Sequence, residues 1–220
     1  MKKFDINTTV FDLDGTLVKS HATIYEATVR TFKKFGRNVD IPKDKFYSLL
    51  GHHFTDMFER LNIEVNDIDH FIDVYKTFYF DYIDLSELYP DVISTLENLK
   101  SINKKIALLT TKGQDQAEKI IKHFGVESYF DYIMGRRPGI AHKPSAEPLL
   151  KICNDLNSNP NKTLMVGDAE LDIQCGKNAN AITCGVTFGY RAKESLMKEN
   201  PDFLVDNYNE FIKIFSNNNN

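Results

Sequence analysis

Short apolar runs alternate with amphipathic stretches along most of the chain. In the amphipathic stretches apolar residues recur with helical spacing, for example at Val92, Leu96 and Leu99. The apolar runs are expected to form strands: Thr8–Leu13, Lys105–Thr110, Tyr132–Met134, Thr163–Val166, Ala181–Val186 and Phe203–Val205. Strands that alternate with helices are typical of an α/β fold, so we predict a parallel sheet flanked by helices.

Two further helical periods lie between these strands. One comprises Ala117, Ile120, Ile121 and Phe124, and it ends at Gly125, a natural helix stop. The other comprises Leu149, Leu150, Cys153 and Leu156. It follows Pro144, which can occupy a first helical turn.

The stretch from about Lys19 to Leu88 interrupts this alternation, because it shows helical periods and no convincing strand. Four helices are predicted there, marked by Tyr25, Val29 and Phe32, by Phe46, Leu49 and Leu50, by Phe54, Phe58 and Leu61, and by Ile68, Phe71, Tyr75, Phe78 and Tyr82. Pro90 marks the return to the sheet. We therefore expect a core domain formed by residues 1–18 and 88–220, with an inserted all-helical domain at 19–87.

Two carboxylates follow the first predicted strand, at Asp12 and Asp14. The carboxyl end of a strand is where ligands bind in an open α/β sheet. Two close carboxylates repel each other unless a divalent cation holds one charged while the other carries a proton. Gly15 permits a sharp turn, and an Asp-Gly turn alone would account for Asp14. Such a turn does not require a second acid, which favours a functional site.

Composition and charge exclude several classes of function. The chain has 220 residues, 42% of them hydrophobic, and a net charge of −4, so bulk charge does not favour nucleic acid or anionic lipid. Cys153, Cys175 and Cys184 are odd in number and lack CxxC spacing, so neither a disulfide framework nor a cysteine zinc site is indicated. We expect a cytoplasmic protein with no membrane or nucleic-acid partner, and no oligomeric state can be inferred.

Four motifs in order resemble those of the haloacid dehalogenase-like hydrolases. The first is Asp-Leu-Asp-Gly-Thr-Leu at 12–17, and the second is Thr110 after Ile-Ala-Leu-Leu. The third is Lys143 in His-Lys-Pro, and the fourth is Gly-Asp-Ala-Glu-Leu-Asp at 167–172. Further segments at 176–179 and 185–191 resemble the phosphoglycolate phosphatase-like branch. The resemblance covers nearly the whole chain and implies a Rossmann-like core with a helical cap.

The resemblance implies a Mg²⁺-dependent phosphomonoester hydrolase that forms an aspartyl-phosphate intermediate. The substrate would be a small phosphorylated metabolite, such as a phosphoglycolate-like one. Asp12 would be the nucleophile and Asp14 the general acid and base. Asp168 would hold Mg²⁺ together with Asp12 and the backbone carbonyl of Asp14, and Lys143 would supply a fixed positive charge.

The resemblance also implies residues that bind the phosphoryl group and orient the metal. Thr110 and Thr111 and the backbone at Gly15 would contact phosphoryl oxygens, although Thr110 alone reads as an ordinary β-branched strand residue. Asp172 would orient the metal shell rather than react. Thr111 stands where the branch often has Asn, and Ala169-Glu170 replaces smaller polar residues, which leaves the local hydrogen bonding open.

Two alternative functions remain. A phosphomutase shares all four motifs, and a non-catalytic phospholigand-binding protein on this scaffold would be expected to lose Asp12 or Asp14. Dehalogenases lack the second acid, and phosphonatases place a Schiff-base lysine in the cap. This chain has Asp14, and its cap segment after Gly51 offers histidines instead.

Cationic residues offer a hypothesis about substrate choice: Lys19, His52, His53, Arg136 and Arg137. If some of them line the closed site, they would favour a substrate with a second anionic group, because a buried cation left unpaired by a neutral ligand weakens binding. His52 is the first candidate, since it follows Gly51 in a loop that can descend onto the core. The alternative is that these residues are solvated charges and turn residues.

Overall fold

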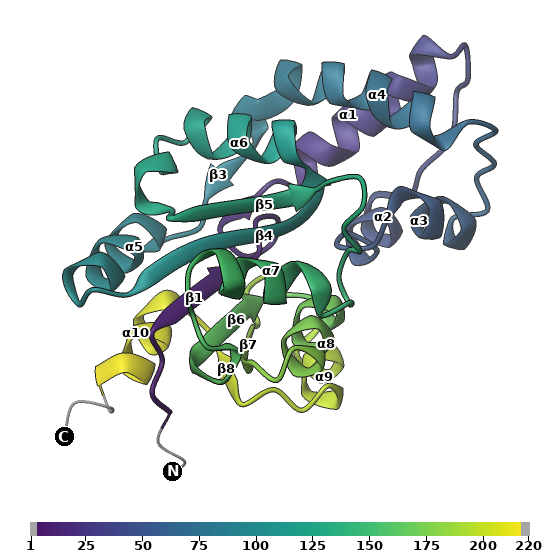
Figure 1. The fold of residues 1–220 in the computed structure, drawn as a ribbon. Helices are drawn as coiled ribbons and strands as arrows, with labels where there is room; N and C mark the ends of the chain where they lie inside the picture. Colours follow the sequence, from purple (N-terminus) through teal and green to yellow (C-terminus); the bar gives the residue numbers. More distant parts are fainter. Residues whose placement is uncertain (1–3, 217–220) are drawn as a thin grey trace.

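A six-stranded parallel sheet forms the centre of the protein, which we describe from a computed structural model over residues 4–216 (Figure 1). The strands stand in the order β5-β4-β1-β6-β7-β8. Their bounds are β1 Thr8–Phe11, β4 Lys105–Gly113, β5 Tyr132–Arg136, β6 Thr163–Gly167, β7 Ile182–Val186 and β8 Phe203–Val205. All six predicted strands are confirmed. The strand order reverses at β1, so its carboxyl end opens between β4 and β6, where ligands of such sheets bind.

Helices cover both faces of this sheet. They are α5 Val92–Ser101, α6 Gln114–His123, α7 Glu147–Asp155, α8 Glu170–Asn178, α9 Lys193–Lys198 and α10 Tyr208–Ser216, with short 3₁₀ turns η2 Glu127–Tyr129 and η3 Pro160–Lys162. Alternate residues of β1 face opposite sides, because Phe11 packs into the cluster with Leu96 and Ile120 while Val10 packs with Leu149 and Met165. None of the described helices is long and apolar enough to cross a bilayer.

The inserted segment is helical, as predicted, and lies beyond the carboxyl ends of the strands (Figure 1). Its elements are α1 His21–Lys34, α2 Lys43–Ser48, α3 Phe54–Arg60, α4 Ile68–Tyr79 and the 3₁₀ turn η1 Phe80–Leu85. Aromatic rings hold it together: the Phe71 ring lies 4.8 Å from that of Phe32 and 5.0 Å from that of Phe58. We call these helices the cap.

A two-stranded ribbon connects the cap to the sheet, and the sequence did not predict it. β2 (Val18–Lys19) pairs antiparallel with β3 (Glu87–Leu88) at the two ends of the stretch expected to lack strands. Two residues per strand are too few to show a period of two, which is why the pattern missed them. The division into domains at 1–18, 88–220 and 19–87 stays a prediction.

The expectation for Pro144 was wrong. α7 begins at Glu147, and the proline in its first turn is Pro148. Residues 141–146 instead form a connection that brings Lys143 under the end of β1, where its ammonium meets Asp12. The segment that holds Pro144 therefore positions this buried cation and does not belong to the helix, which begins three residues after the proline.

Candidate active site

The turn after β1 places two aspartates at the carboxyl end of the sheet. The backbone N–H of Asp12 still donates to the carbonyl of Val166 in β6 (2.9 Å). The pairing of β1 with β6 therefore fixes the position of the Asp12 side chain. Gly15 has a φ of +84°, and a Cβ at that position would lie 2.2 Å from Oδ2 of Asp168. Glycine is therefore required here, because the chain must turn in the left-handed region and pass against a carboxylate.

Three buried carboxylates gather at this point: Asp12, Asp168 and Asp172. One oxygen from each lies within 4.8 Å of the others. Burial raises the pKa of Asp12, which neighbouring carboxylates also raise and Lys143 lowers. Burial, followed by Asp172, raises the pKa of Asp168 to about 7. We call these three residues with Lys143 the acidic centre.

Lys143 is the cation of the acidic centre. Its Nζ donates to Asp12 Oδ1 (2.7 Å), Asp172 Oδ1 (2.5 Å) and the carbonyl of Leu109 (3.1 Å), and the residue is 3% exposed. Burial alone would lower the pKa of Lys143, but the two carboxylates raise it, so the ammonium stays charged. One ammonium cannot balance three ionised carboxylates, and an all-oxygen cluster with residual negative charge fits a divalent cation such as Mg²⁺.

The other acids of the centre have distinct surroundings. Asp168 accepts from the backbone N–H of Tyr190 (2.7 Å) and from Thr16 Oγ1 (3.3 Å). Asp172 accepts from Lys143 and from the backbone N–H of Ala169 (3.0 Å). Both oxygens of each acid thus accept from protein donors, but Asp172 alone of the two is held by the Lys143 ammonium, which suits its expected role of orienting the metal shell.

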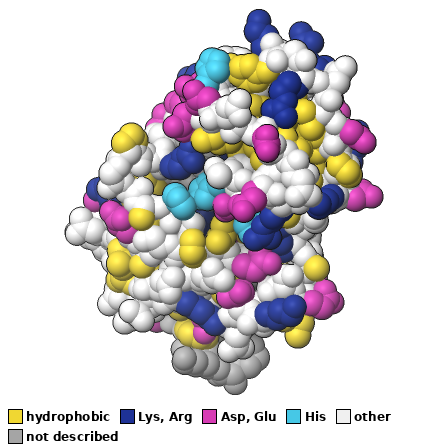
Figure 2. All heavy atoms as spheres, turned by 90° about the vertical axis from the view of Figure 1, so that its right-hand side faces the viewer, with side chains coloured by type: hydrophobic (Ala, Val, Ile, Leu, Met, Phe, Trp, Pro, Cys, Tyr) yellow, Lys and Arg dark blue, Asp and Glu magenta, His cyan; other side chains and the backbone are white. Residues whose placement is uncertain are grey.

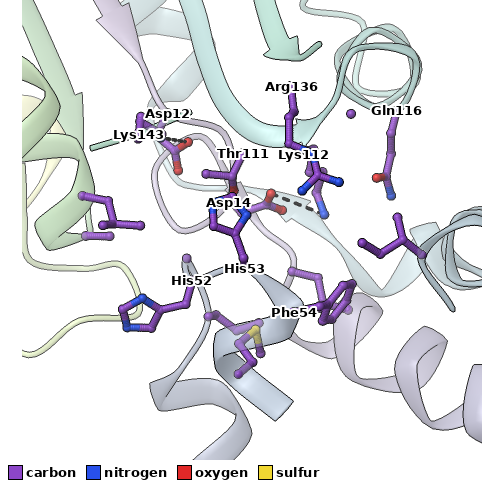
Figure 3. A pocket seen from close by; sticks show the side chains of 18 of the residues that line it. Asp12, Asp14, His52, His53, Phe54, Thr111, Lys112, Gln116, Arg136 and Lys143 are labelled. Atoms are coloured by element: carbon purple, nitrogen blue, oxygen red, sulfur yellow. Dashed lines mark hydrogen bonds and ion pairs between the residues drawn. The ribbon is translucent and has the colours of Figure 1, made fainter. Parts of the chain in front are cut away.

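Asp14 lies apart from the acidic centre, among partners that the sequence did not suggest. Ser20 Oγ donates to Asp14 Oδ1, and Tyr190 Oη lies 3.0 Å from Ser20 Oγ. Lys112 Nζ lies 3.4 Å from Asp14 Oδ2 (Figure 3). The one available signal for Lys112 was its position directly after Thr110 and Thr111. Tyr190 lies in the segment 185–191 that carries the family resemblance, but no role was expected for it, and Ser20 carried no signal.

A pocket lies between the sheet edge and the cap, and Figure 3 views it from close by. Its core side includes Asp12, Asp14, Thr111, Lys112, Lys143 and Asp172, and its cap side includes Gly51, His52, His53, Phe54, Tyr75 and Lys76. Gly15, Thr110 and Asp168 are not among the residues that line this pocket. Thr110 Oγ1 accepts the backbone N–H of Lys112 (3.2 Å), which leaves its own hydroxyl proton to donate.

The structure separates the candidate cations. Arg136 and both histidines line the pocket, whereas Lys19 pairs with Glu87 (3.2 Å) in the ribbon and Arg137 donates to Gln114 (2.9 Å). In Figure 3 the ring that lies beside Asp14 belongs to His53, and the ring of His52 points away from it.

His53 spans the gap between cap and core. Its Nε2 lies 2.9 Å from Nδ1 of His142, next to Lys143. Burial, followed by His142, lowers the pKa of His53 to about 4. Histidine, acidic and basic side chains gather at mid-height on this side of the molecule (Figure 2). The sequence favoured His52 over His53, but the backbone of the loop before α3 decides which ring faces the core, and it is His53 that contacts His142.

Known proteins match this chain over most of its length. The family model for haloacid dehalogenase-like hydrolases matches residues 9–186. The pyrophosphatase PpaX of Halalkalibacterium halodurans is 33% identical over 216 residues, which cover 96% of this chain and 97% of that protein. PpaX of Bacillus cereus is 31% identical over 213 residues, covering 96% and 97%.

Solved structures share the fold. A haloacid dehalogenase-like family hydrolase from Streptococcus pneumoniae superposes with a TM-score of 0.87 at 24% identity, covering 96% of this chain and 99% of that one. A protein from Haemophilus somnus, described as a predicted phosphoglycolate phosphatase, gives 0.86 at 24% identity, covering 97% and 100%. The chain therefore belongs to the haloacid dehalogenase-like hydrolases, as an enzyme of the phosphatase class.

Proposed function

We propose that the protein is a Mg²⁺-dependent phosphohydrolase that forms a phosphoryl ester on Asp12. The observation that carries the proposal is the position of Asp12 at the mouth of β1, with one carboxylate oxygen on Lys143 and the residue on the pocket wall. An oxygen bound to an ammonium is held in place, which leaves the other oxygen to attack phosphorus. A nucleophile fixed in this way meets the requirement for covalent phosphoryl transfer.

The reaction divides into two displacements. An oxygen of Asp12 forms a bond to phosphorus while the bond from phosphorus to the leaving oxygen breaks, and Asp14 gives that oxygen a proton. Asp14 then takes a proton from a water molecule that attacks phosphorus, and Asp12 is released with inorganic phosphate. Lys143 offsets negative charge near the transferred group throughout, and Thr110 and Thr111 supply hydroxyl donors.

Asp12, Asp168 and the backbone carbonyl of Asp14 would hold Mg²⁺, while Asp172 orients this set. The bound ion supplies charge that offsets the phosphoryl oxygens and the clustered carboxylates. Three buried free thiols, Cys153, Cys175 and Cys184, accord with action in the reducing cytoplasm.

Two substrate classes fit the pocket. A phosphorylated small acid, such as a phosphoglycolate-like one, agrees with the cations that face it, and inorganic pyrophosphate is favoured by the PpaX relatives. A phosphomutase would use the same acids but would need to shield the phosphorylated Asp12 from water. A non-catalytic binding protein would not need the pairing of Asp12 with Lys143.

Asp12→Asn tests the proposal. A neutral amide is a poor nucleophile, so we expect phosphate release from pyrophosphate, phosphoglycolate and p-nitrophenyl phosphate to fall more than about 1,000-fold, with no acid-stable trapping of labelled phosphate on the protein. Asp155→Asn makes the same change on the exposed surface and should keep full turnover. Near-native turnover in Asp12→Asn would exclude Asp12 as the nucleophile. Transfer of phosphate to a sugar phosphate without release would instead indicate the mutase.

A further inference from the structure

A group of polar side chains beside Asp14 is not used by the proposed chemistry. It comprises Lys112 near the end of β4, Gln116 on α6, and Tyr75 and Lys76 on α4, and all four line the pocket. We call this group the outer subsite. In Figure 3 Lys112 and Gln116 lie on the side of Asp14 away from Asp12 and Lys143.

Lys112 brings a positive charge to the outer subsite, and because its side chain is buried the ammonium loses most of its hydration there. Its side chain is 9% exposed, its Nζ lies 3.4 Å from Asp14, and the ammonium sits 4.3 Å from the ring centroid of Tyr79. The Asp14 carboxylate and the Tyr79 ring both stabilise a cation. An ammonium has three N–H groups, however, and a single carboxylate at 3.4 Å does not use them all. A ligand in the pocket can use that capacity.

Two buried polar side chains of the outer subsite lack hydrogen-bond partners other than each other. Gln116 and Tyr75 are each 3% exposed and their polar groups meet, but neither Gln116 Nε2 nor Tyr75 Oη makes a hydrogen bond to any other residue in the part of the chain described. Buried polar groups are normally paired, because an unpaired one loses its hydration without compensation. Both residues line the pocket, so a ligand rich in acceptors could supply the missing partners.

The start of α6 adds to the same region. Gly113 lines the pocket, and α6 begins there without a side-chain cap, so its first backbone N–H groups are open to an acceptor. Lys76 approaches from the cap, and its Nζ would lie 3.4 Å from a Cβ at Gly113. Its ion pairs with Asp73 and Asp115 are long, at 3.8 Å each, and the acids are exposed, so a ligand can compete for it.

We propose that the outer subsite binds an anionic leaving group: a second phosphoryl or carboxylate group joined to the oxygen that Asp14 protonates. The inference rests on the proposed hydrolysis, since it uses Asp14 to locate the leaving oxygen. Lys112 lies within 3.4 Å of Asp14, so whatever is bonded to that oxygen must pass next to Lys112. Lys112 and Lys76 are cations, and Gln116 Nε2 and the Tyr75 hydroxyl can both donate, which favours an anion over an uncharged alkyl group.

The test compares substrates that differ in the leaving group alone. Values of kcat/KM are measured for pyrophosphate, phosphoglycolate and ethyl phosphate in the wild type. We expect at least one of the two anionic substrates to exceed ethyl phosphate by about 100-fold or more. The larger of the two ratios identifies the second group as phosphoryl or carboxylate. Equal values for all three substrates would overturn the proposal.

Variants then assign the preference to the outer subsite. Gln116→Met keeps the side-chain length but removes the donor and does not touch Asp14, and we expect the ratio of anionic to ethyl substrate to fall about 10-fold. In Lys112→Met the ratio should fall roughly 100-fold. Tyr75→Phe keeps the ring packing on Phe54 and should lower it about fivefold. Lys122 is exposed on α6, the helix that also carries Gln116. Lys122→Met is therefore the matched control and should leave the ratio of anionic to ethyl substrate unchanged.

The outcomes separate this inference from the proposed function. If the wild type hydrolyses none of the three substrates, the proposed function has failed. If it hydrolyses them but Gln116→Met and Lys112→Met lower all rates by one common factor, Lys112 acts through Asp14 and the outer subsite is excluded. Circular dichroism and thermal unfolding identify any variant that fails to fold, in which case Tyr75→Phe, the mildest change, decides.

Discussion

The acidic centre and the outer subsite are two walls of one pocket, and they satisfy their polar groups in opposite ways. In the acidic centre Lys143 meets three acceptors, and Asp168 and Asp172 each accept two protein donors. In the outer subsite Gln116 Nε2 and Tyr75 Oη have no partner in the described chain apart from each other. A catalytic group must be held before substrate arrives, whereas a specificity group must keep its capacity for the substrate.

The largest expected effect comes from removing the cation of the acidic centre. Lys143→Met leaves Asp12 and Asp172 buried without their ion-pair partner. We expect the free energy of unfolding to fall by about 3–5 kcal/mol, together with a loss of turnover greater than about 1,000-fold. Urea unfolding and initial rates measure both quantities.

The matched change on the surface is Lys151→Met, which breaks an exposed pair with Asp155 at 2.9 Å. It should cost no more than about 1 kcal/mol and leave turnover intact. Comparable losses of stability in the two variants would mean that the acidic centre is no more tightly organised than the surface.

A second prediction concerns pH and metal. The pKa of Asp168 is raised to about 7 from a usual value near 3.8, so the folded state holds its proton more strongly than the unfolded state does. Without metal, the free energy of unfolding should therefore fall as the pH rises from about 4 to about 7. Mg²⁺ binds the ionised form, so it should raise Tm more at pH 8 than at pH 5.

Differential scanning calorimetry with Mg²⁺ or EDTA measures this difference. Asp168→Asn removes the titrating group, and both the fall with pH and the response to Mg²⁺ should shrink. An equal effect of Mg²⁺ at both pH values in the wild type would show that the ion does not bind to these carboxylates.

The same contrast explains how far the sequence could predict the molecule. Sheet and cap helices follow from periodic burial, and the acids follow from their positions after Phe11 and Val166 at strand ends. The contact of Lys143 with Asp12 joins residues 131 positions apart, and only the family resemblance placed it. Gln116 and Tyr75 could not be found, because in sequence they read as ordinary residues of two amphipathic helices. Their significance arises from missing partners, which no local pattern encodes.

The smallest expected effect belongs to the contact of His53 with His142 across the pocket mouth. The pKa of His53 is lowered to about 4, first by burial and then by His142 and Arg136, so the fold holds this ring neutral. A histidine whose folded pKa lies below its usual 6.5 stabilises the fold above that pH and loses this contribution as the pH falls toward 4. The dependence is opposite in sign to that of Asp168, although both environments resist charge.

We therefore expect acidification from pH 7.5 to 5.5 to lower the free energy of unfolding of the wild type by less than about 1 kcal/mol relative to His53→Gln, since the ring is only half-buried. His70→Gln, exposed on α4, serves as the control and should follow the wild type. The KM of the wild type should stay close to that of His53→Gln in the same interval, because a folded pKa of about 4 keeps the ring neutral at pH 5.5. If both variants follow the wild type in the free energy of unfolding, the histidine contact does not hold the cap, and closure must depend on substrate bound at the outer subsite.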